Sequence, residues 1–181
     1  DASCDWSSDV CSSDLEYLDN RRPSGVTFVL NLKEDLARRD FTINALAFNE
    51  VDGLIDYFGG IKDLENKIIR AVGEPNKRFQ EDALRMLRAI RFAALLDFDI
   101  EEKTMKAIKT NCHLILNVSN ERIRDELCKM MISNNTTKAL TLLEETKLLE
   151  LILPELQKCV GFNQQNPHRS EEDTSQLQSQ D

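Results

Sequence analysis

The stretch that decides the fold is RFQEDALRMLRAIRF, residues 78–92. Proline and glycine are absent from it, and alanine, leucine, methionine, glutamate and arginine are good helix formers. The sequence therefore predicts one continuous helix here. At about 100° per residue, the apolar side chains gather on one side and form a core face. These residues are Ala83, Met86, Leu87, Ile90 and Ala94.

The opposite side of this predicted helix carries charged groups. It collects Arg78, Asp82, Arg85, Ala89 and Phe92, with Glu81 and Arg88 at its flank. Asp82 and Arg85 are three residues apart, so a helix projects them together from adjacent turns. The cations of the stretch are all arginine, which suits fork-shaped recognition of phosphates or base edges. A carboxylate beside a guanidinium offers the acceptors and donors that reading a Watson–Crick edge requires. A solvated face of ion pairs is the alternative reading.

The charge of the chain is unevenly distributed. Its 181 residues can bury a real core in one domain or two small ones, and the formal net charge is −9. Residues 1–15 contribute −4 and residues 169–181 contribute −3, which leaves −2 for residues 16–168. Nine of the eleven arginines in that middle part lie between Arg21 and Arg91. This local basic bias favours a polyanionic partner.

Cysteine and histidine spacing argues against a zinc site. The five cysteines show no Cys-x-x-Cys pair, and the two histidines are far apart. An odd cysteine count in a lysine- and glutamate-rich chain suits a reducing compartment. The sequence has no apolar run of membrane-spanning length and no signal-peptide pattern. We therefore expect a cytoplasmic protein without a membrane partner.

Both ends differ from the rest of the chain. Residues 1–15 and 169–181 are polar, biased in composition and without helical or strand periodicity. They look like translated adapter or vector sequence, so we expect non-native or disordered tails that do not belong to the folded part of the chain.

Between the ends, strand signals come first and helical signals follow. We expect strands at 26–30, within 51–60 and at 68–72, and short helices at 45–48 and 62–67. Beyond Phe98 every signal is helical, with segments at 101–109, 120–133 and 136–149 and a last one interrupted by Pro154. A sheet fragment followed by helices predicts an α+β fold that becomes all-α.

Three motifs in order carry a family resemblance: RRDFTIN at 38–44, DYFGG at 56–60 and the stretch at 78–92. Together they resemble class II tRNA nucleotidyltransferases, the CCA-adding enzymes of the nucleotidyltransferase/poly(A) polymerase superfamily. The similarity runs from about Tyr17 to Glu155. It implies that residues 16–60 are the C-terminal part of a mixed-sheet nucleotidyltransferase head. Residues 61–125 would be a helical neck that selects nucleotides and binds RNA, and 126–168 the start of a helical body.

The resemblance also implies nucleotide-binding residues. Asp82 and Arg85 would meet the Watson–Crick edge of the incoming CTP or ATP, and Arg39 would meet the triphosphate. Arg88 and Arg91 would belong to the same site. On an ideal wheel Arg91 lies about 180° from Asp82, so it reaches the ligand only if the helix end curves or its side chain bends round.

Further residues are implied at the sugar and at a hinge. Asp40 and Asn44 would lie near the ribose, where distinguishing a 2′-hydroxyl needs a hydrogen-bonding partner. Arg38 would either contact the ligand or support the turn, and Asp40 could instead organise that turn. A hinge between head and neck would include Asp56, Gly59 and Gly60. The family usually has proline where this chain has Tyr57. The Glu121-Arg122-Ile-Arg124 segment resembles a later neck motif with a structural role.

The resemblance implies two Mg²⁺ ions for the intact parent, clamped by paired carboxylates. The family takes these from a glycine-rich stretch and an Asp-x-Asp, and nothing before Arg38 matches them. We therefore assign no catalytic residue and no metal ligand, and we expect the chain alone to be inactive. The partners implied for the parent are CTP, ATP and the tRNA 3′ end, and we infer no protein partner.

Other functions stay open at this point. A bacterial poly(A) polymerase fragment would share the same motifs, and CC-adding or A-adding enzymes are further relatives. From another class, the chain could be a non-catalytic helical module that binds RNA or nucleotides. A purely structural helical protein predicts no loss of nucleotide affinity on Asp82→Ala or Arg85→Ala.

Overall fold

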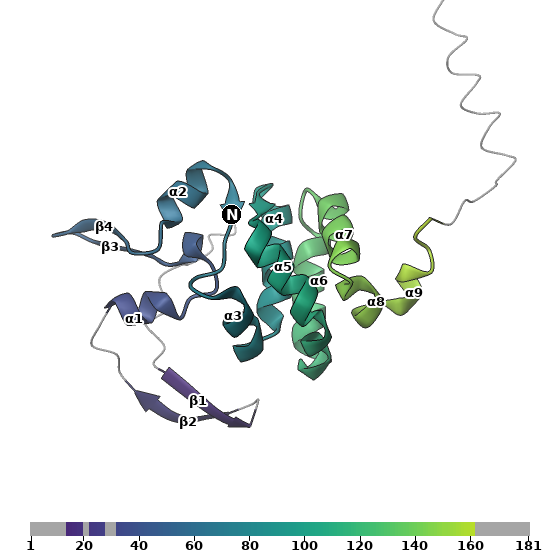
Figure 1. Cartoon of the computed structure of the whole chain (residues 1–181), viewed down its shortest axis with the longest axis horizontal. Coiled ribbons are helices and arrows are strands. Elements are labelled where there is room, and N and C mark those ends of the chain that lie inside the picture. Colours follow the sequence, from purple (N-terminus) through teal and green to yellow (C-terminus); the bar gives the residue numbers. More distant parts are fainter. Residues whose placement is uncertain (1–13, 20–21, 28–31, 162–181) are drawn as a thin grey trace, which may run out of the picture.

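The computed structural model describes residues 14–19, 22–27 and 32–161 (Figure 1). Helices α4 to α9 (between residues 84 and 157) succeed one another across the molecule. Helix α1 (32–37), helix α2 (60–65) and the β3–β4 hairpin (46–56) lie on the other side of α4 (Figure 1). Small sheets followed by helices confirm the expected α+β class. The tail predicted at 169–181 and residues 1–13 of the tail predicted at 1–15 lie outside the described residues.

The first two strands form an antiparallel hairpin. Strand β1 covers Asp14–Asp19 and strand β2 covers Arg22–Thr27. The first strand therefore begins two residues inside the range predicted to be a tail. Strand β2 overlaps only the start of the strand predicted at 26–30, and residues 28–30 are outside the described part.

The next segment contains a second hairpin, and here one expectation was wrong. Helix α1 covers Leu32–Ala37, a 3-10 turn covers Thr42–Asn44, and strand β3 covers Leu46–Asn49. A helix was expected over 45–48, but residues 46–48 pair in antiparallel register with strand β4, Gly53–Asp56. The pairing overrides the helical preference of alanine and leucine.

A short parallel pair joins two distant segments. Helix α2 covers Gly60–Glu65, and strand β5, Ile68–Ile69, pairs with strand β6, Asp99–Ile100. On the other side of this segment, residue 41 bridges residue 71. Strand β6 was missed because two residues carry no periodicity. The segment at 68–72 thus lies between the loop at 40–42 and residues 99–101.

The stretch at 78–92 is two helices, not one. Helix α3 covers Pro75–Glu81 and helix α4 covers Leu84–Leu96. Asp82 between them is extended, with φ −148° and ψ 106°. Its carboxylate Oδ1 accepts a hydrogen bond from the Leu84 backbone N–H at 3.0 Å. Aspartate favours such local bonds at helix starts over helix interiors, which explains the break.

Most of the remaining helices follow the expectation, but the segment expected at 136–149 is divided. Helix α7 ends at Glu145, and α8 begins at Leu148 after Lys147, which has a left-handed φ of 62°. Helix α6 starts just after Ser119, and the Asn135 side chain caps α7 by accepting from the Lys138 N–H at 3.4 Å. Pro154 opens the last helix. Their bounds are α5 Glu102–Asn111, a 3-10 segment Cys112–Asn117, α6 Asn120–Met131, α7 Thr136–Glu145, α8 Leu148–Ile152 and α9 Pro154–Gln157.

Helix α4 is the centre of the main core. All five residues predicted for its core face are buried. Ala89 was placed on the opposite, polar face, but it is fully buried. Phe92 from that face packs edge-on against Phe41, with ring centroids 5.8 Å apart. The reason is that α4 packs on both α6 and α7, so it buries more than one side. None of the helices among the described residues is long and apolar enough to span a membrane.

Candidate functional site

Asp82 lies where α3 ends and α4 begins, and both of its carboxylate oxygens are engaged. Oδ1 accepts from the Leu84 N–H, and Oδ2 accepts from Arg122 Nη2 on α6 at 2.8 Å. The Asp82 and Arg122 side chains retain 31% and 50% exposure. A carboxylate oriented on two sides while still reaching solvent is held in place and open to a ligand. Arg122 of the predicted structural motif therefore supports Asp82.

Arg85 binds different partners from Asp82. Its Nη1 donates to Glu81 Oε2 at 2.9 Å and to the Arg78 carbonyl at 3.3 Å. Its Nη2 donates to the Arg38 carbonyl at 3.2 Å. The three-residue spacing does not pair Asp82 with Arg85 because the backbone between them is not continuous helix. Arg85 instead ties the start of α4 to the loop that leads into residues 38–44.

The same loop contacts α4 one turn further on. Asp40 is buried, and its Oδ2 lies 2.7 Å from both Nε and Nη2 of Arg88. Its Oδ1 accepts from the Phe41 N–H and from Asn44 Nδ2, each at 2.9 Å. The structure thus brings Asp40, Asn44 and Arg88 together, as the sequence prediction grouped them around one ligand. It also supports the alternative that Asp40 organises its own turn.

Arg91 contacts Glu126 of α6 and is largely enclosed. Its Nε lies 3.0 Å from Glu126 Oε2, and the side chains are 14% and 5% exposed. Within the described residues neither atom has a hydrogen-bond partner, so the contact is an ion pair only. Burial lowers the pKa of Arg91 while the Glu126 charge opposes this. The guanidinium also lies 4.5 Å from the Phe92 ring centroid.

Arg38 and Arg39 occupy the near end of this loop. Arg38 contributes its carbonyl to Arg85. Arg39 is 44% exposed and lies 3.5 Å from Asp35, one turn earlier. An exposed pair at that distance contributes little to stability, so Arg39 can turn toward a ligand at small cost.

The predicted hinge is a tight carboxylate cap. Asp56 Oδ1 accepts from the N–H groups of Phe58, Gly59 and Gly60 at 2.8–3.1 Å, and Oδ2 accepts from Ile61 at 3.0 Å. Gly59 adopts a left-handed φ of 77°, a conformation that glycine reaches without steric cost. Burial alone would raise the pKa of Asp56, but the four backbone donors outweigh it and lower the pKa. The cap fixes the chain where it enters α2.

This cap predicts a pH-dependent stability. A lowered folded-state pKa means that Asp56 stabilises the fold above the ordinary aspartate value of about 3.9 and loses that contribution as the pH falls through its folded pKa. We expect Asp56→Asn to lower the free energy of unfolding at pH 7 and to matter progressively less below about pH 4. Urea unfolding of both proteins from pH 7 to pH 3 measures this. A difference that stays constant to pH 3 would contradict the role of the charge.

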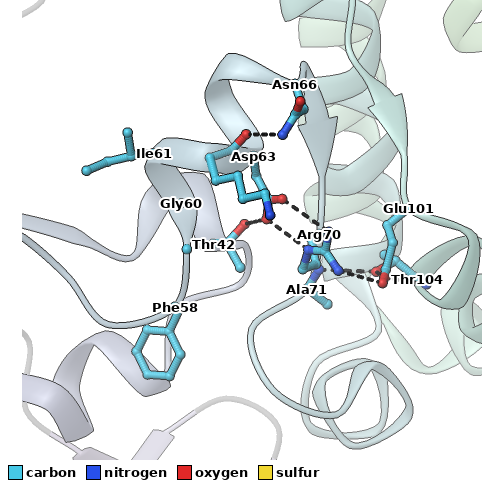
Figure 2. Close-up of polar contacts among 12 residues, drawn as sticks. Thr42, Phe58, Gly60, Ile61, Asp63, Asn66, Arg70, Ala71, Glu101 and Thr104 are labelled. Carbon is cyan, nitrogen blue, oxygen red and sulfur yellow. Dashed lines mark hydrogen bonds and ion pairs between the residues drawn. The ribbon is translucent and has the colours of Figure 1, made fainter.

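Sequence reasoning missed a second polar cluster, which joins the loop at 40–44, helix α2, the residue after strand β5 and the start of helix α5 (Figure 2). It contains Thr42, Asp63, Arg70, Glu101 and Thr104. Thr104 lies with Ala107, Ile108 and Asn111 on the buried face of α5. The sequence signal that could have identified Thr104 is a polar residue at a position whose helical spacing predicts burial. Glu126, one turn before the buried Met130 of α6, carried the same signal.

A metal centre is not built by these residues. Across residues 14–19, 22–27 and 32–161, no group of three or more His, Cys, Asp or Glu side chains could hold a metal ion. The arrangement instead offers a held carboxylate, several arginines and an amide around the start of α4. Such a set can hydrogen-bond a polar ring and neutralise phosphate.

Two family models match the chain, one before and one after the segment at 71–96 that contains α3 and α4. The one described as the poly A polymerase head domain matches residues 10–70. The one described as the probable RNA and SrmB-binding site of polymerase A matches residues 97–159. The head match begins before residue 16, inside the range predicted to be a tail.

Curated relatives and solved structures agree with these matches. The CCA-adding enzyme of Lactobacillus helveticus is 55% identical over 134 residues, which are 74% of this chain and 34% of that protein. The Bacillus stearothermophilus CCA-adding enzyme in complex with CTP has a TM-score of 0.66 at 49% identity, covering 68% of this chain and 31% of that one. The Thermotoga maritima CCA-adding enzyme complexed with tRNA has a TM-score of 0.64 at 37% identity, with the same coverage. The chain spans about a third of the length of the curated relatives it matches.

Proposed function

Because the chain belongs to the family of tRNA nucleotidyltransferases and poly(A) polymerases, we propose that it forms the head-to-neck part of a CCA-adding enzyme. Such an enzyme transfers CMP and AMP to the tRNA 3′ end without a nucleic-acid template. The relatives bound to CTP and to tRNA support these partners. A tRNA substrate makes the cytoplasm the expected compartment.

The observation that carries the proposal is the arrangement at the start of α4. Asp82 is a partly exposed carboxylate held by Arg122, and Arg85 reaches the loop before residue 42 from the next turn. A cytosine or adenine presents donor and acceptor groups side by side on its Watson–Crick edge. Asp82 would accept from the exocyclic amine of the base, and Arg85 would donate to the ring nitrogen or carbonyl beside it.

The neighbouring residues receive the remaining roles in the proposal. Arg88, held by Asp40, and the exposed Arg39 would face the sugar–phosphate part of the nucleotide. Asp40 and Asn44 would organise the ribose side. Arg91 remains a proposed member of the site, although its ion pair with Glu126 fits a structural role better. Domain boundaries at residues 60 and 125 follow the same proposal.

We extend the proposal to metal use by the whole protein, with Mg²⁺ as the ion. Two divalent cations would activate the primer hydroxyl and neutralise the leaving pyrophosphate. The side chains in the described part of this chain do not supply such a centre. The roles proposed above for the residues of this chain are binding and selecting the nucleotide.

Removing either base-facing side chain is expected to weaken nucleotide binding. Asp82→Ala and Arg85→Ala should each raise the Kd for CTP about 5- to 150-fold, the equivalent of about 1–3 kcal/mol. The reason is that a polar group on the edge of the bound base would be left without its hydrogen-bond partner. Isothermal titration of the folded variants measures this. Arg124→Ala is the matched control, since Arg124 is 69% exposed and pairs only with its neighbour Asp125 among the described contacts. Unchanged affinity in both test variants would favour a structural protein.

Nucleotide choice tests the function itself. The chain should bind CTP and ATP more tightly than UTP and GTP, because the edge presented by Asp82 and Arg85 suits bases with an exocyclic amine next to an acceptor nitrogen. Titration with the four nucleotides under identical conditions gives the order. Equal affinity for all four would point to a phosphate-binding module, and a preference for ATP alone would favour the poly(A) polymerase branch.

A further inference from the structure

Arg70 lies at the centre of the polar cluster that sequence reasoning missed, and three of its nitrogens are used (Figure 2). Nε and Nη2 donate to Asp63 Oδ2 and Oδ1 at 2.9 and 3.2 Å. Nη1 donates to Glu101 Oε1 at 2.8 Å. One guanidinium therefore bridges helix α2 and the start of helix α5, a geometry that a lysine ammonium cannot reproduce.

Each carboxylate also contacts a third group. Asp63 is buried, and its Oδ2 also accepts from the Thr42 hydroxyl at 2.7 Å. Glu101 Oε2 accepts from the Thr104 hydroxyl at 2.8 Å, and that hydroxyl oxygen accepts from the Ala71 N–H at 3.2 Å. The cluster thus runs from the loop at 40–44 to helix α5 without a break.

Backbone bonds carry the same connection to the candidate site. The Thr42 N–H donates to the Arg70 carbonyl at 2.9 Å, and the Val72 N–H donates to the Asp40 carbonyl at 3.1 Å. Asp40 in turn holds Arg88. A displacement of the segment at 68–72 therefore moves the Asp40 backbone, and with it the carboxylate that orients Arg88.

We propose that Arg70 is a positioning residue of the nucleotide site, which fixes the loop at 40–44 against α4 so that the Asp40–Arg88 pair keeps one geometry. The expected consequence, weaker CTP binding, rests on the proposed function. The effect of Arg70 on the Asp40–Arg88 geometry does not. The Arg70 side chain is 40% exposed, whereas its partner Asp63 is 5% exposed. A lysine at this position would keep a positive charge beside that buried carboxylate but would lose the fork geometry that reaches both Asp63 and Glu101. Arg70→Lys is therefore expected to affect orientation more than stability.

The test compares Arg70→Lys with Arg124→Lys, an exposed arginine whose ion pair spans adjacent residues. The first readout is the NMR chemical shift of the Arg88 Nε–H in the folded protein, which reports the hydrogen bond to Asp40. This shift does not depend on the fraction of molecules that is folded. In Arg70→Lys it should move toward its position in an Asp40→Ala reference, while Arg124→Lys leaves it in place. The second readout is the Kd for CTP, expected to rise about tenfold in Arg70→Lys only.

The outcomes separate the two proposals. A folded Arg70→Lys with an unmoved Arg88 resonance overturns the positioning role. If wild type binds no CTP, the proposed function fails, and the Arg88 resonance alone still decides the positioning role. If Arg70→Lys does not fold, Thr42→Val decides on the same readouts, because it removes only the hydroxyl that links Asp63 to the loop. A displaced resonance and weaker CTP binding in that variant support the proposal, and an unmoved resonance overturns it.

Discussion

Replacing Arg91 by methionine is expected to lower the free energy of unfolding by about 3 kcal/mol or more. Removing one partner of a buried ion pair leaves the other charge uncompensated, which costs about 3–5 kcal/mol. Glu126 is 5% exposed, and among the described residues its other ion-pair partners are the more distant Lys129 at 3.5 Å and Arg88 at 4.0 Å. These contacts offset part of the loss, so we expect the lower end of the range. Urea denaturation at pH 7 gives the value.

The double variant Arg91→Met with Glu126→Gln is the control. It removes the stranded charge, so most of the lost stability should return. If the single variant loses less than about 1 kcal/mol, or the double variant is no more stable than the single one, the ion pair is not what holds α4 against α6. The same double variant separates the two roles of Arg91. Unchanged CTP affinity assigns it to the fold, and weakened affinity assigns it to the nucleotide.

Gly60→Ala is expected to have the second largest effect. A Cβ at this position would overlap the Thr42 carbonyl oxygen and lie 3.1 Å from Leu46 Cδ2. The obstructing oxygen belongs to the backbone and cannot rotate away, so α2 or the loop at 40–44 has to shift. We expect a loss of about 3 kcal/mol in unfolding free energy, at the upper end of overpacking. Because this loop also holds Asp40, CTP binding should weaken in whatever fraction stays folded.

Gly59→Ala is the matched control for this clash. A methyl group at Gly59 would point into open space, but the residue has a φ of 77°. Alanine there meets only the backbone strain of the left-handed region, about 1–2 kcal/mol. Thermal or urea unfolding should therefore rank Gly60→Ala below Gly59→Ala and both below wild type. Equal losses of unfolding free energy in the two variants would mean that α2 or the Thr42 backbone can move apart at little cost.

The sequence was most informative where periodicity was strong. The predicted core face of α4 is buried because its spacing matches a helix packed on neighbouring helices. The break at Asp82 was not predicted, although aspartate is a poor interior residue and a good cap, because the residues around it are strong helix formers. The wheel positions of Asp82 relative to Arg85 and Arg91 were therefore wrong, even though the individual residues lie where a site can form.

The elements that sequence reasoning missed depend on contacts far apart in the chain. Strand β3 exists because it pairs with β4, and strand β6 exists because it pairs with β5. Arg70 contacts Glu101 across 31 positions, and no local pattern records that separation. The ordered motifs at 38–44, 56–60 and 78–92, in contrast, were sufficient to predict the family, which the comparisons confirmed.

The measurement that tests the central claim most directly is the transfer of nucleotides to tRNA by a chimeric enzyme that contains part of this chain. Residues 16–159 of this chain would replace the matching segment of the Lactobacillus helveticus CCA-adding enzyme, and transfer of labelled CMP and AMP to tRNA lacking its 3′ end would be followed. The account predicts that the chimera adds both nucleotides and that Asp82→Ala within it greatly reduces addition. A folded chimera that adds neither nucleotide, or one in which Asp82→Ala changes nothing, would contradict it.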